Sequence, residues 1–184
     1  MEFMGHVSLK ENDLFPTWSK DARNNIDLED LLQMSSGLAF DETYAPGSDS
    51  TKMLFMAHSA SDIALTATAE VPPGEHFSYS SGTTNIISRW MYERLGNNLQ
   101  ANYDFLIQEL FTELSMAHSI FETDPSGVFV GSSYIYASGR DWARLGLLML
   151  NDGEFNGKRL LNEAWVANAS TPNTSGCLLY TSPS

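Results

Sequence analysis

One segment of the chain places a tyrosine where it could take part in proton transfer. Residues 72–82, PPGEHFSYSSG, put Tyr79 at the end of a short extended stretch, directly before a predicted helix that begins at Ser81. Backbone N–H groups and the helix dipole at such a point favour nearby negative charge, which would help a phenolate. A tyrosine in water has a pKa of about 10, so a base of this kind needs a cation nearby. The segment has no Lys within reach, and from the residues alone a packed tyrosine with a satisfied hydroxyl is the stronger interpretation.

The common hydrolase motifs are absent from the printed sequence. No Lys has a Ser three residues before it, and there is no Gly-x-Ser-x-Gly elbow, glycine-rich phosphate loop or His-Glu-x-x-His pair. The four His lack the paired spacing of a zinc site, and surface or capping roles are the stronger interpretation for His58, His76 and His118. The residues alone therefore predict no metal site, no cofactor and no complete catalytic constellation.

Length and composition exclude several classes of protein. The 184 residues suffice for one domain or a piece of a larger one, and ten Lys and Arg against twenty-three Asp and Glu give a net charge of −13. Such an acidic balance argues against binding nucleic acid or an anionic membrane surface. No window approaches eighteen consecutive apolar residues, and the first residues have no apolar stretch typical of a signal peptide. A single Cys permits no internal disulfide.

Hydrophobic periodicity and capping residues predict a mainly helical chain with one extended region. The first helix falls within residues 24–38, with Asp27 as N-cap, Asp30 at N3 and Gly37 as the left-handed residue after its end. Residues 40–50 read as loop, and a second helix is expected from near Ser59 to before Val71. The other expected elements are a helix from Ser81 to about Leu95, a helix over 99–114, a loose hairpin or extended loop over 119–137, a helix over 138–150, a tight turn at Asn156-Gly157 and a helix opening near Asn162.

The helix over 138–150 is expected to begin at Ser138 as N-cap, with Asp141 at N3. Arg140 and Asp141 are expected to serve capping and a surface ion pair. The helical spacing also predicts that Trp142 and Trp165 lie in the core.

Three blocks of the chain, in the same order and at similar spacing, resemble consecutive blocks of the serine β-lactamase-related family. They are IDLEDLLQMSSGL at 26–38, PGEHFSYSSGTTN at 73–85 and GSSYIYASGRDWARLGL at 131–147. That family includes class C β-lactamases, D-alanyl-D-alanine carboxypeptidases, family VIII esterases and aminohexanoate-oligomer hydrolases. The resemblance covers about residues 5–170 and implies an α+β protein of the β-lactamase/transpeptidase-like fold.

The resemblance also implies a role for Tyr79, which matches the family's tyrosine in a Tyr-x-Asn or Tyr-Ser-x motif. There the tyrosine completes a proton relay with the Ser and Lys of a Ser-x-x-Lys motif, and the serine forms an acyl-enzyme. Ser81 stands where many members have Asn, a departure that favours an esterase, amidase or oligomer hydrolase over a dedicated β-lactamase. Ser132, Ser133 and Tyr134 are candidates for lining the substrate cleft, although turn hydroxyls bonding their own backbone are the stronger interpretation for the serines.

Two family motifs are not found in the chain, and we therefore expect it to be an internal fragment dominated by the helical domain. Residues 1–176 are expected to lack the Ser-x-x-Lys helix, which would precede Met1, and the Lys-Thr-Gly or His-x-Gly strand of the C-terminal sheet. The last eight residues, CLLYTSPS at 177–184, resemble the translation of a sequencing adapter and are expected to be a foreign tail. The only Cys would then say nothing about the redox compartment.

The sequence thus predicts a fragment of a serine hydrolase that cleaves small-molecule esters or amides, without metal or cofactor. The fragment itself is expected to be inactive. A penicillin-binding-type D-alanyl-D-alanine carboxypeptidase and a catalytically dead binding or regulatory relative stay open as alternatives. The sequence leaves the substrate, the oligomeric state and the compartment open.

Overall fold

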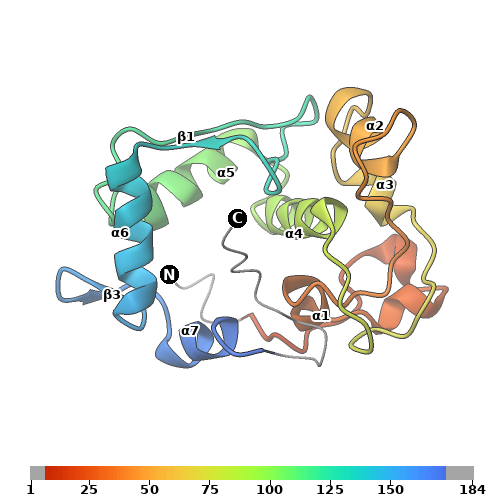
Figure 1. Ribbon diagram of the computed structural model, residues 1–184, viewed down its shortest axis with the longest axis horizontal. Coiled ribbons are helices and arrows are strands. Elements are labelled where there is room, and N and C mark those ends of the chain that lie inside the picture. The colour runs from red at the N-terminus through yellow and green to blue at the C-terminus, as the bar shows by residue number, and fades with distance from the viewer. Residues whose placement is uncertain (1–6, 173–184) are drawn as a thin grey trace. The chain divides into compact units, whose positions relative to one another are not determined.

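The structure is a computed structural model that describes residues 7–172, in two compact units (Figure 1). The first unit combines the described part of Met1–Leu99 with Glu122–Tyr134, and the second combines Gln100–Phe121 with the described part of Ile135–Ser184. The expected foreign tail, 177–184, lies outside the described residues. No helix among the described residues is long and apolar enough to cross a membrane.

The first unit is built around one long helix, α4, which packs against α1 and α3. Its core joins aromatic and aliphatic side chains from the N-terminal turns, α1 and α4, among them Trp18, Leu31, Ile86 and Trp90. Its elements are the 3-10 turns η2 (Pro16–Trp18) and η3 (Ala22–Asn25) and the helices α1 (Leu28–Leu32), α2 (Asp49–Phe55), α3 (Asp62–Leu65) and α4 (Ser81–Arg94).

Helix α1 confirms the predicted capping box and ends earlier than predicted. The Asp27 side chain accepts from the Asp30 N–H at 2.9 Å, and the Asp30 carboxylate accepts from the Asp27 N–H at 3.0 Å. The helix stops at Leu32 because Met34 adopts a left-handed conformation with φ of 56°. Gly37 is left-handed as expected, with φ of 74°, but it lies beyond the helix end.

The region between α1 and α4 differs most from the prediction. Residues 40–48 are loop as expected, but Ser48 caps the helix α2, which was not predicted. Its signal is weak because only Ser50 and Met53 of its seven residues are buried. The helix expected from near Ser59 is confined to the four residues of α3, because the chain after it pairs with Leu38 through Ala69.

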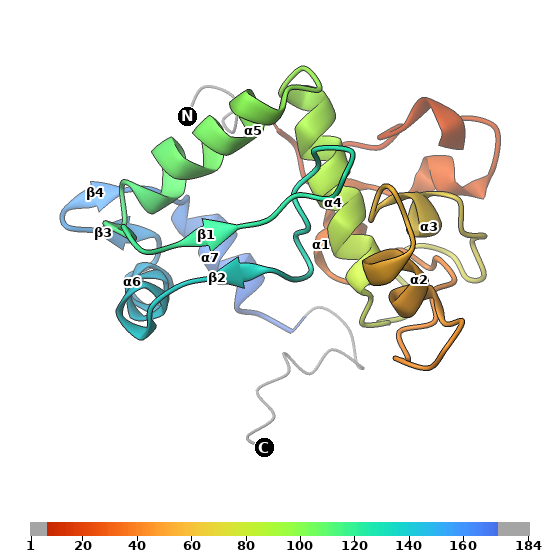
Figure 2. The ribbon, with the colours of Figure 1, turned by 90° about the horizontal axis from the view of Figure 1, so that it is seen from above.

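The second unit contains helices α5 (Leu99–Leu106), α6 (Gly139–Leu150) and α7 (Glu163–Ala169), with two short antiparallel strand pairs (Figure 2). Strand β1 (Ile120–Phe121) pairs with β2 (Ile135–Tyr136), which confirms the predicted hairpin. Strand β3 (Glu154–Phe155) pairs with β4 (Lys158–Arg159) across the predicted Asn156-Gly157 turn. Helix α5 continues into one π-helical turn, η4 (Ile107–Phe111), so the predicted helix over 99–114 is regular only in its first half.

Helix α6 has the predicted cap, but the predicted burial of Trp142 is wrong. Trp142 is 45 % exposed and Trp165, in α7, is 39 % exposed, so neither lies in the core. Asp141 is fully buried and pairs with Arg144 at 2.6 Å, not with Arg140 on the surface. Helical spacing shows which side chains share a face, but it does not show whether another element covers that face.

Candidate active site

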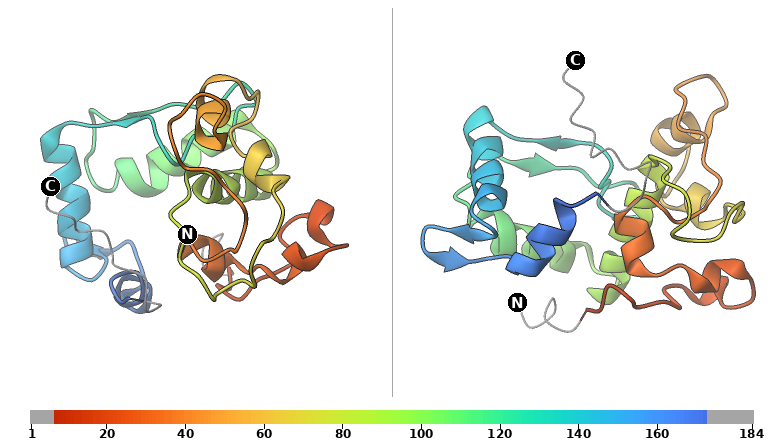
Figure 3. Two further views of the ribbon diagram at one scale, coloured as in Figure 1. Left: turned by 45° about the vertical axis from the view of Figure 1, so that its right-hand side comes forward. Right: turned by 60° about the horizontal axis from the view of Figure 1, so that its bottom comes forward.

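Tyr79 is held from both sides while its own side chain stays exposed. The Ser78 N–H donates to the Met34 carbonyl oxygen at 2.8 Å, so the left-handed turn after α1 anchors the residue before Tyr79. On the other side, the Ser80 hydroxyl accepts from the Thr83 N–H at 3.0 Å and caps α4. Figure 3 shows this segment running past α1 before it enters α4.

The Tyr79 ring is 60 % exposed, and its hydroxyl has no hydrogen-bond partner within residues 7–172. The interpretation of Tyr79 as a packed tyrosine is therefore wrong. A phenol that is fixed through its backbone and has no partner in the described part of the chain is available to a substrate or to another catalytic group.

Ser81, the first residue of α4, binds the carboxylate of Glu42 with two hydrogen bonds. Its N–H donates to Glu42 Oε2 at 2.8 Å, and its hydroxyl donates to Glu42 Oε1 at 2.5 Å. The side chain of Ser81 is buried. The negative charge that the N-terminus of α4 attracts is thus supplied by Glu42, and sequence reasoning did not identify this residue.

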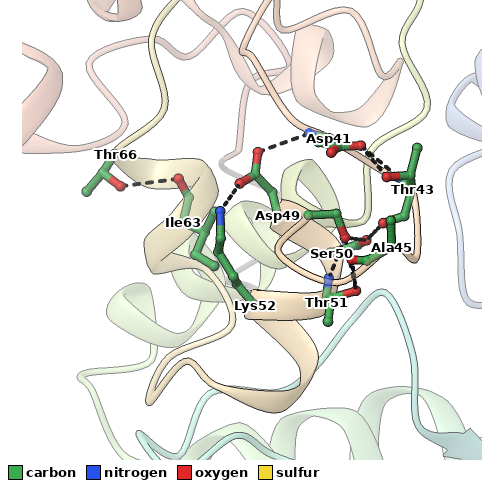
Figure 4. A network of polar contacts seen from close by, with 10 residues as sticks. Asp41, Thr43, Ala45, Asp49, Ser50, Thr51, Lys52, Ile63 and Thr66 are labelled. Atoms are coloured by element: carbon green, nitrogen blue, oxygen red, sulfur yellow. Dashed lines mark hydrogen bonds and ion pairs between the residues drawn. The ribbon is translucent and has the colours of Figure 1, made fainter.

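The loop that carries Glu42 is fixed by contacts on both of its neighbours (Figure 4). The Asp41 N–H donates to Asp49 Oδ2 at 3.0 Å, and the Asp41 carboxylate accepts from the N–H and the hydroxyl of Thr43 at 3.0 and 2.7 Å. The Thr43 hydroxyl holds the pKa of Asp41 below its usual range. The Ser50 hydroxyl donates to the Thr43 carbonyl, so the start of α2 closes the loop.

The loop at 131–134 carries the other three predicted cleft residues, and each of them has different contacts. Ser132 contacts α4, because Asn85 Nδ2 donates to its hydroxyl oxygen at 2.9 Å. Tyr134 has a φ of 65° and packs against the buried side chains of Met53, Ala60 and Val130. Ser133 is partly exposed, and its N–H donates to the Val130 carbonyl at 3.1 Å. Ser132 therefore contacts α4, the helix that begins at Ser81, while Tyr134 packs against the core of the first unit.

A pocket of about 370 Å³ opens elsewhere in the first unit. It is lined by Phe15, Pro16, Thr17, Arg23, Asp62, Leu65, Thr66, Arg89 and Glu93. Arg89 and Glu93 belong to the C-terminal half of α4, whereas Tyr79 and Ser81 lie at its N-terminus. Arg23 is engaged by Asp21 at 2.7 Å and by the Leu65 carbonyl at 2.8 Å, which gives it a structural role. None of the predicted site residues lines this pocket.

The described residues offer no group of three or more His, Cys, Asp or Glu that could hold a metal ion. The polar side chains that contact one another at the N-terminus of α4 are hydroxyls and one carboxylate. Such groups accept, donate and relay protons.

Comparisons with known proteins show the family through one family model and the fold through several solved structures. A family model described as Beta-lactamase matches residues 13–176. A solved structure from Bacillus anthracis, described as a 6-aminohexanoate-dimer hydrolase, is 21 % identical with a TM-score of 0.73, and the match covers 90 % of this chain and 47 % of that one. A structure from Bacteroides dorei DSM 17855 described as a beta-lactamase is 19 % identical with a TM-score of 0.66, over 90 % and 50 % of the two chains.

An octameric penicillin-binding protein homologue from Pyrococcus abyssi is 14 % identical with a TM-score of 0.66, over 94 % of this chain and 45 % of that one. No curated protein matches the chain significantly. At these identities the three structures show a common fold, and the chain spans about half of their length.

Proposed function

Because the chain belongs to the beta-lactamase family and has the β-lactamase/transpeptidase-like fold, we propose that it is part of a serine hydrolase that cleaves esters or amides. In this proposal the chain contributes the helical part of the domain and the tyrosine of the active site. The serine nucleophile and its lysine come from a Ser-x-x-Lys helix in the complete protein, by which we mean this chain together with the residues that flank it in its gene.

The proposed reaction is acyl transfer through the serine. The serine oxygen attacks the substrate carbonyl carbon, and its proton passes through the lysine and Tyr79 to the leaving alcohol or amine. Water then attacks the acyl-enzyme carbonyl and releases the acid, which restores the serine. The exposed hydroxyl of Tyr79, which has no hydrogen-bond partner within residues 7–172, supports this role, because a relay residue must reach both the nucleophile and the leaving group.

The contact between Ser81 and Glu42 supports an ester, amide or oligomer substrate over a β-lactam. A serine hydroxyl has one proton to donate, and here that proton is directed at Glu42 Oε1. The asparagine found at this position in many relatives offers two amide protons. Ser81 therefore has no donor left for a substrate, whereas an asparagine at this position would have one, and this departure from many relatives carries the choice of substrate class.

The chain by itself is proposed to be inactive, since it contains no Ser-x-x-Lys motif. Incubation of the purified chain with a fluorophosphonate probe tests this directly. We expect no labelling. Labelling that a second serine-hydrolase inhibitor blocks would contradict the proposal.

The complete protein separates the proposal from its two alternatives. Its gene is recovered by reading the DNA on both sides of the segment that encodes this chain, and the protein is assayed with p-nitrophenyl esters and a labelled penicillin. We expect rapid ester turnover and no stable penicillin adduct. A stable adduct with slow ester turnover would favour the D-alanyl-D-alanine carboxypeptidase. A flanking sequence without Ser-x-x-Lys would favour the binding or regulatory relative and overturn the enzyme proposal.

A further inference from the structure

We propose that Asn85 is a positioning residue that turns the hydroxyl of Ser132 into a hydrogen-bond donor for a substrate oxygen. The inference rests on the proposed function. In it, Ser132 binds the substrate and Asn85 orients Ser132. It is carried by the contacts between α4 and the loop at 131–134.

Both ends of the Asn85 amide act on Ser132. Nδ2 donates to Ser132 Oγ at 2.9 Å, and Oδ1 accepts from the Ser132 N–H at 3.5 Å. A backbone N–H can only donate, so the atom facing it must be the amide oxygen, and this fixes which end of the amide faces the hydroxyl. Asn85 is 1 % exposed, and its Nδ2 also contacts Met53 Sδ at 3.2 Å, so it has little freedom to turn away.

The direction of the hydrogen bond decides what Ser132 can do. Its oxygen accepts from Asn85, which leaves its own proton for another acceptor. No described residue accepts that proton, and Ser132 is only partly buried. A hydroxyl in this state is a donor directed by the protein and open to a ligand. The matching substrate group is an oxygen that accepts, such as a carbonyl or a carboxylate.

The loop backbone lies directly on α4, which limits how far Ser132 can move. A Cβ on Gly131 would lie 2.3 Å from the Ser88 hydroxyl oxygen and 3.4 Å from Thr84 Cγ2. Ser81, Asn85 and Ser88 follow one another at the spacing of a single helix face. Asn85, which binds Ser132, therefore lies about one helical turn after Ser81, on the helix that begins two residues after Tyr79.

The test is a double-mutant cycle on the complete protein with a p-nitrophenyl ester as substrate. Ser132→Ala removes the donor, and Asn85→Ala removes its support. We expect each single change to lower kcat/KM about 10-fold, and the double change to lower it no further. Asn102→Ala, at an equally buried asparagine in α5, is the control and should leave kcat/KM unchanged.

Asn85→Asp gives a readout that loss of structure would not produce. An ionised carboxylate accepts from the Ser132 hydroxyl and takes away the proton meant for the substrate, with almost no change in shape. We expect kcat/KM to fall about as far as in Ser132→Ala and to recover, relative to the wild type, as the pH is lowered and the carboxyl can donate again.

The outcomes separate the inference from the proposed function. An active wild type in which the two single changes multiply, or in which Ser132→Ala has no effect, would overturn the inference alone. A folded complete protein that is neither acylated nor able to turn over esters would overturn the proposed function and the inference with it. Circular dichroism of each variant shows whether it has folded, and Ser132→Ala, at a partly exposed side chain, keeps the test decisive if Asn85→Ala unfolds.

Discussion

The carboxylate of Glu42 spans the backbone N–H and the hydroxyl of Ser81, at 2.8 and 2.5 Å, and so closes the N-terminus of α4. The two residues are 39 positions apart in the chain. The contact joins the loop after α1 to the helix that begins two residues after Tyr79. It therefore links the structure of the first unit to the position of the proposed proton relay.

Replacing Glu42 tests how much this contact stabilises the protein. In Glu42→Gln, one of the two acceptor oxygens becomes an amide that can only donate, so one of the Ser81 donors loses its partner. We expect the free energy of unfolding of the complete protein to fall by about 1–3 kcal/mol. Urea denaturation measures this, with Glu75→Gln at an exposed position as the control. Equal stability of the two variants would show that the contact is not formed in solution.

Asp141 makes the stability of the protein decrease as the pH falls. The Ser138 hydroxyl and, less strongly, Arg144 hold the pKa of Asp141 below its usual range. Because the folded value is lower than the value of about 3.9 in an unfolded chain, the stabilisation is present above about pH 4 and is lost as the pH falls through the folded value. We expect Asp141→Asn to lower the melting temperature at pH 7, and we expect this difference from the wild type to shrink as the pH is lowered below about 4.

The control for this measurement is Asp13→Asn, at an exposed aspartate whose side chain has no partner among the described residues. The melting temperature of Asp13→Asn should differ little from that of the wild type at both pH 7 and pH 3. A difference for Asp141→Asn that stays constant between pH 7 and pH 3 would contradict the pKa shift.

Asn102 predicts a stabilising substitution. It is fully buried in α5, and neither its amide nitrogen nor its amide oxygen has a hydrogen-bond partner among the described residues. Burying an amide without partners is unfavourable, so Asn102→Leu, which has nearly the same shape, should stabilise the complete protein by about 1–2 kcal/mol. Asn85→Leu is the matched comparison and should destabilise it, because that amide has partners. Destabilisation by Asn102→Leu would show that its amide is bonded in solution.

The exposed side chains of α6 and α7 predict low stability for the chain on its own. Trp142, Leu147 and Leu150 are between 45 % and 76 % exposed, and Trp165 is 39 % exposed. We expect a sheet in the complete protein to cover such faces, as helices of this architecture need a partner layer. The isolated chain should then unfold over a broad range of urea concentration. A sharp thermal transition together with well-dispersed NMR signals would contradict this.

Local sequence signals predicted most helix starts well. They could not predict contacts between residues far apart in the sequence. The caps at Asp27, Ser80 and Ser138 involve partners three residues away, which a single window of sequence contains. The partners of Ser81 and Ser132, by contrast, lie 39 and 47 positions away. Glu42 stands in a polar loop and Asn85 inside a helix, where neither differs from a solvated or capping residue until the chain is folded.

The incorrect prediction that Trp142 is buried has a different cause. The spacing along α6 places its apolar residues in one group, in which Leu148 is fully buried and Trp142 is exposed. Which side of the group is covered depends on elements that the spacing does not encode. The motif order was the more informative signal, since it indicated the family whose model matches residues 13–176.

The central claim is that Tyr79 relays a proton during acylation of a serine in the complete protein. The most direct measurement is the rate of covalent labelling by a fluorophosphonate, followed by intact-mass spectrometry, in the wild type, in Tyr79→Phe and in the control Tyr136→Phe. We predict one adduct per wild-type molecule, on the serine of a Ser-x-x-Lys motif. Tyr136→Phe should be labelled at the wild-type rate. Tyr79→Phe should fold normally and be labelled at least about 100-fold more slowly. No adduct on the folded wild type, or equal labelling rates in all three proteins, would contradict the claim.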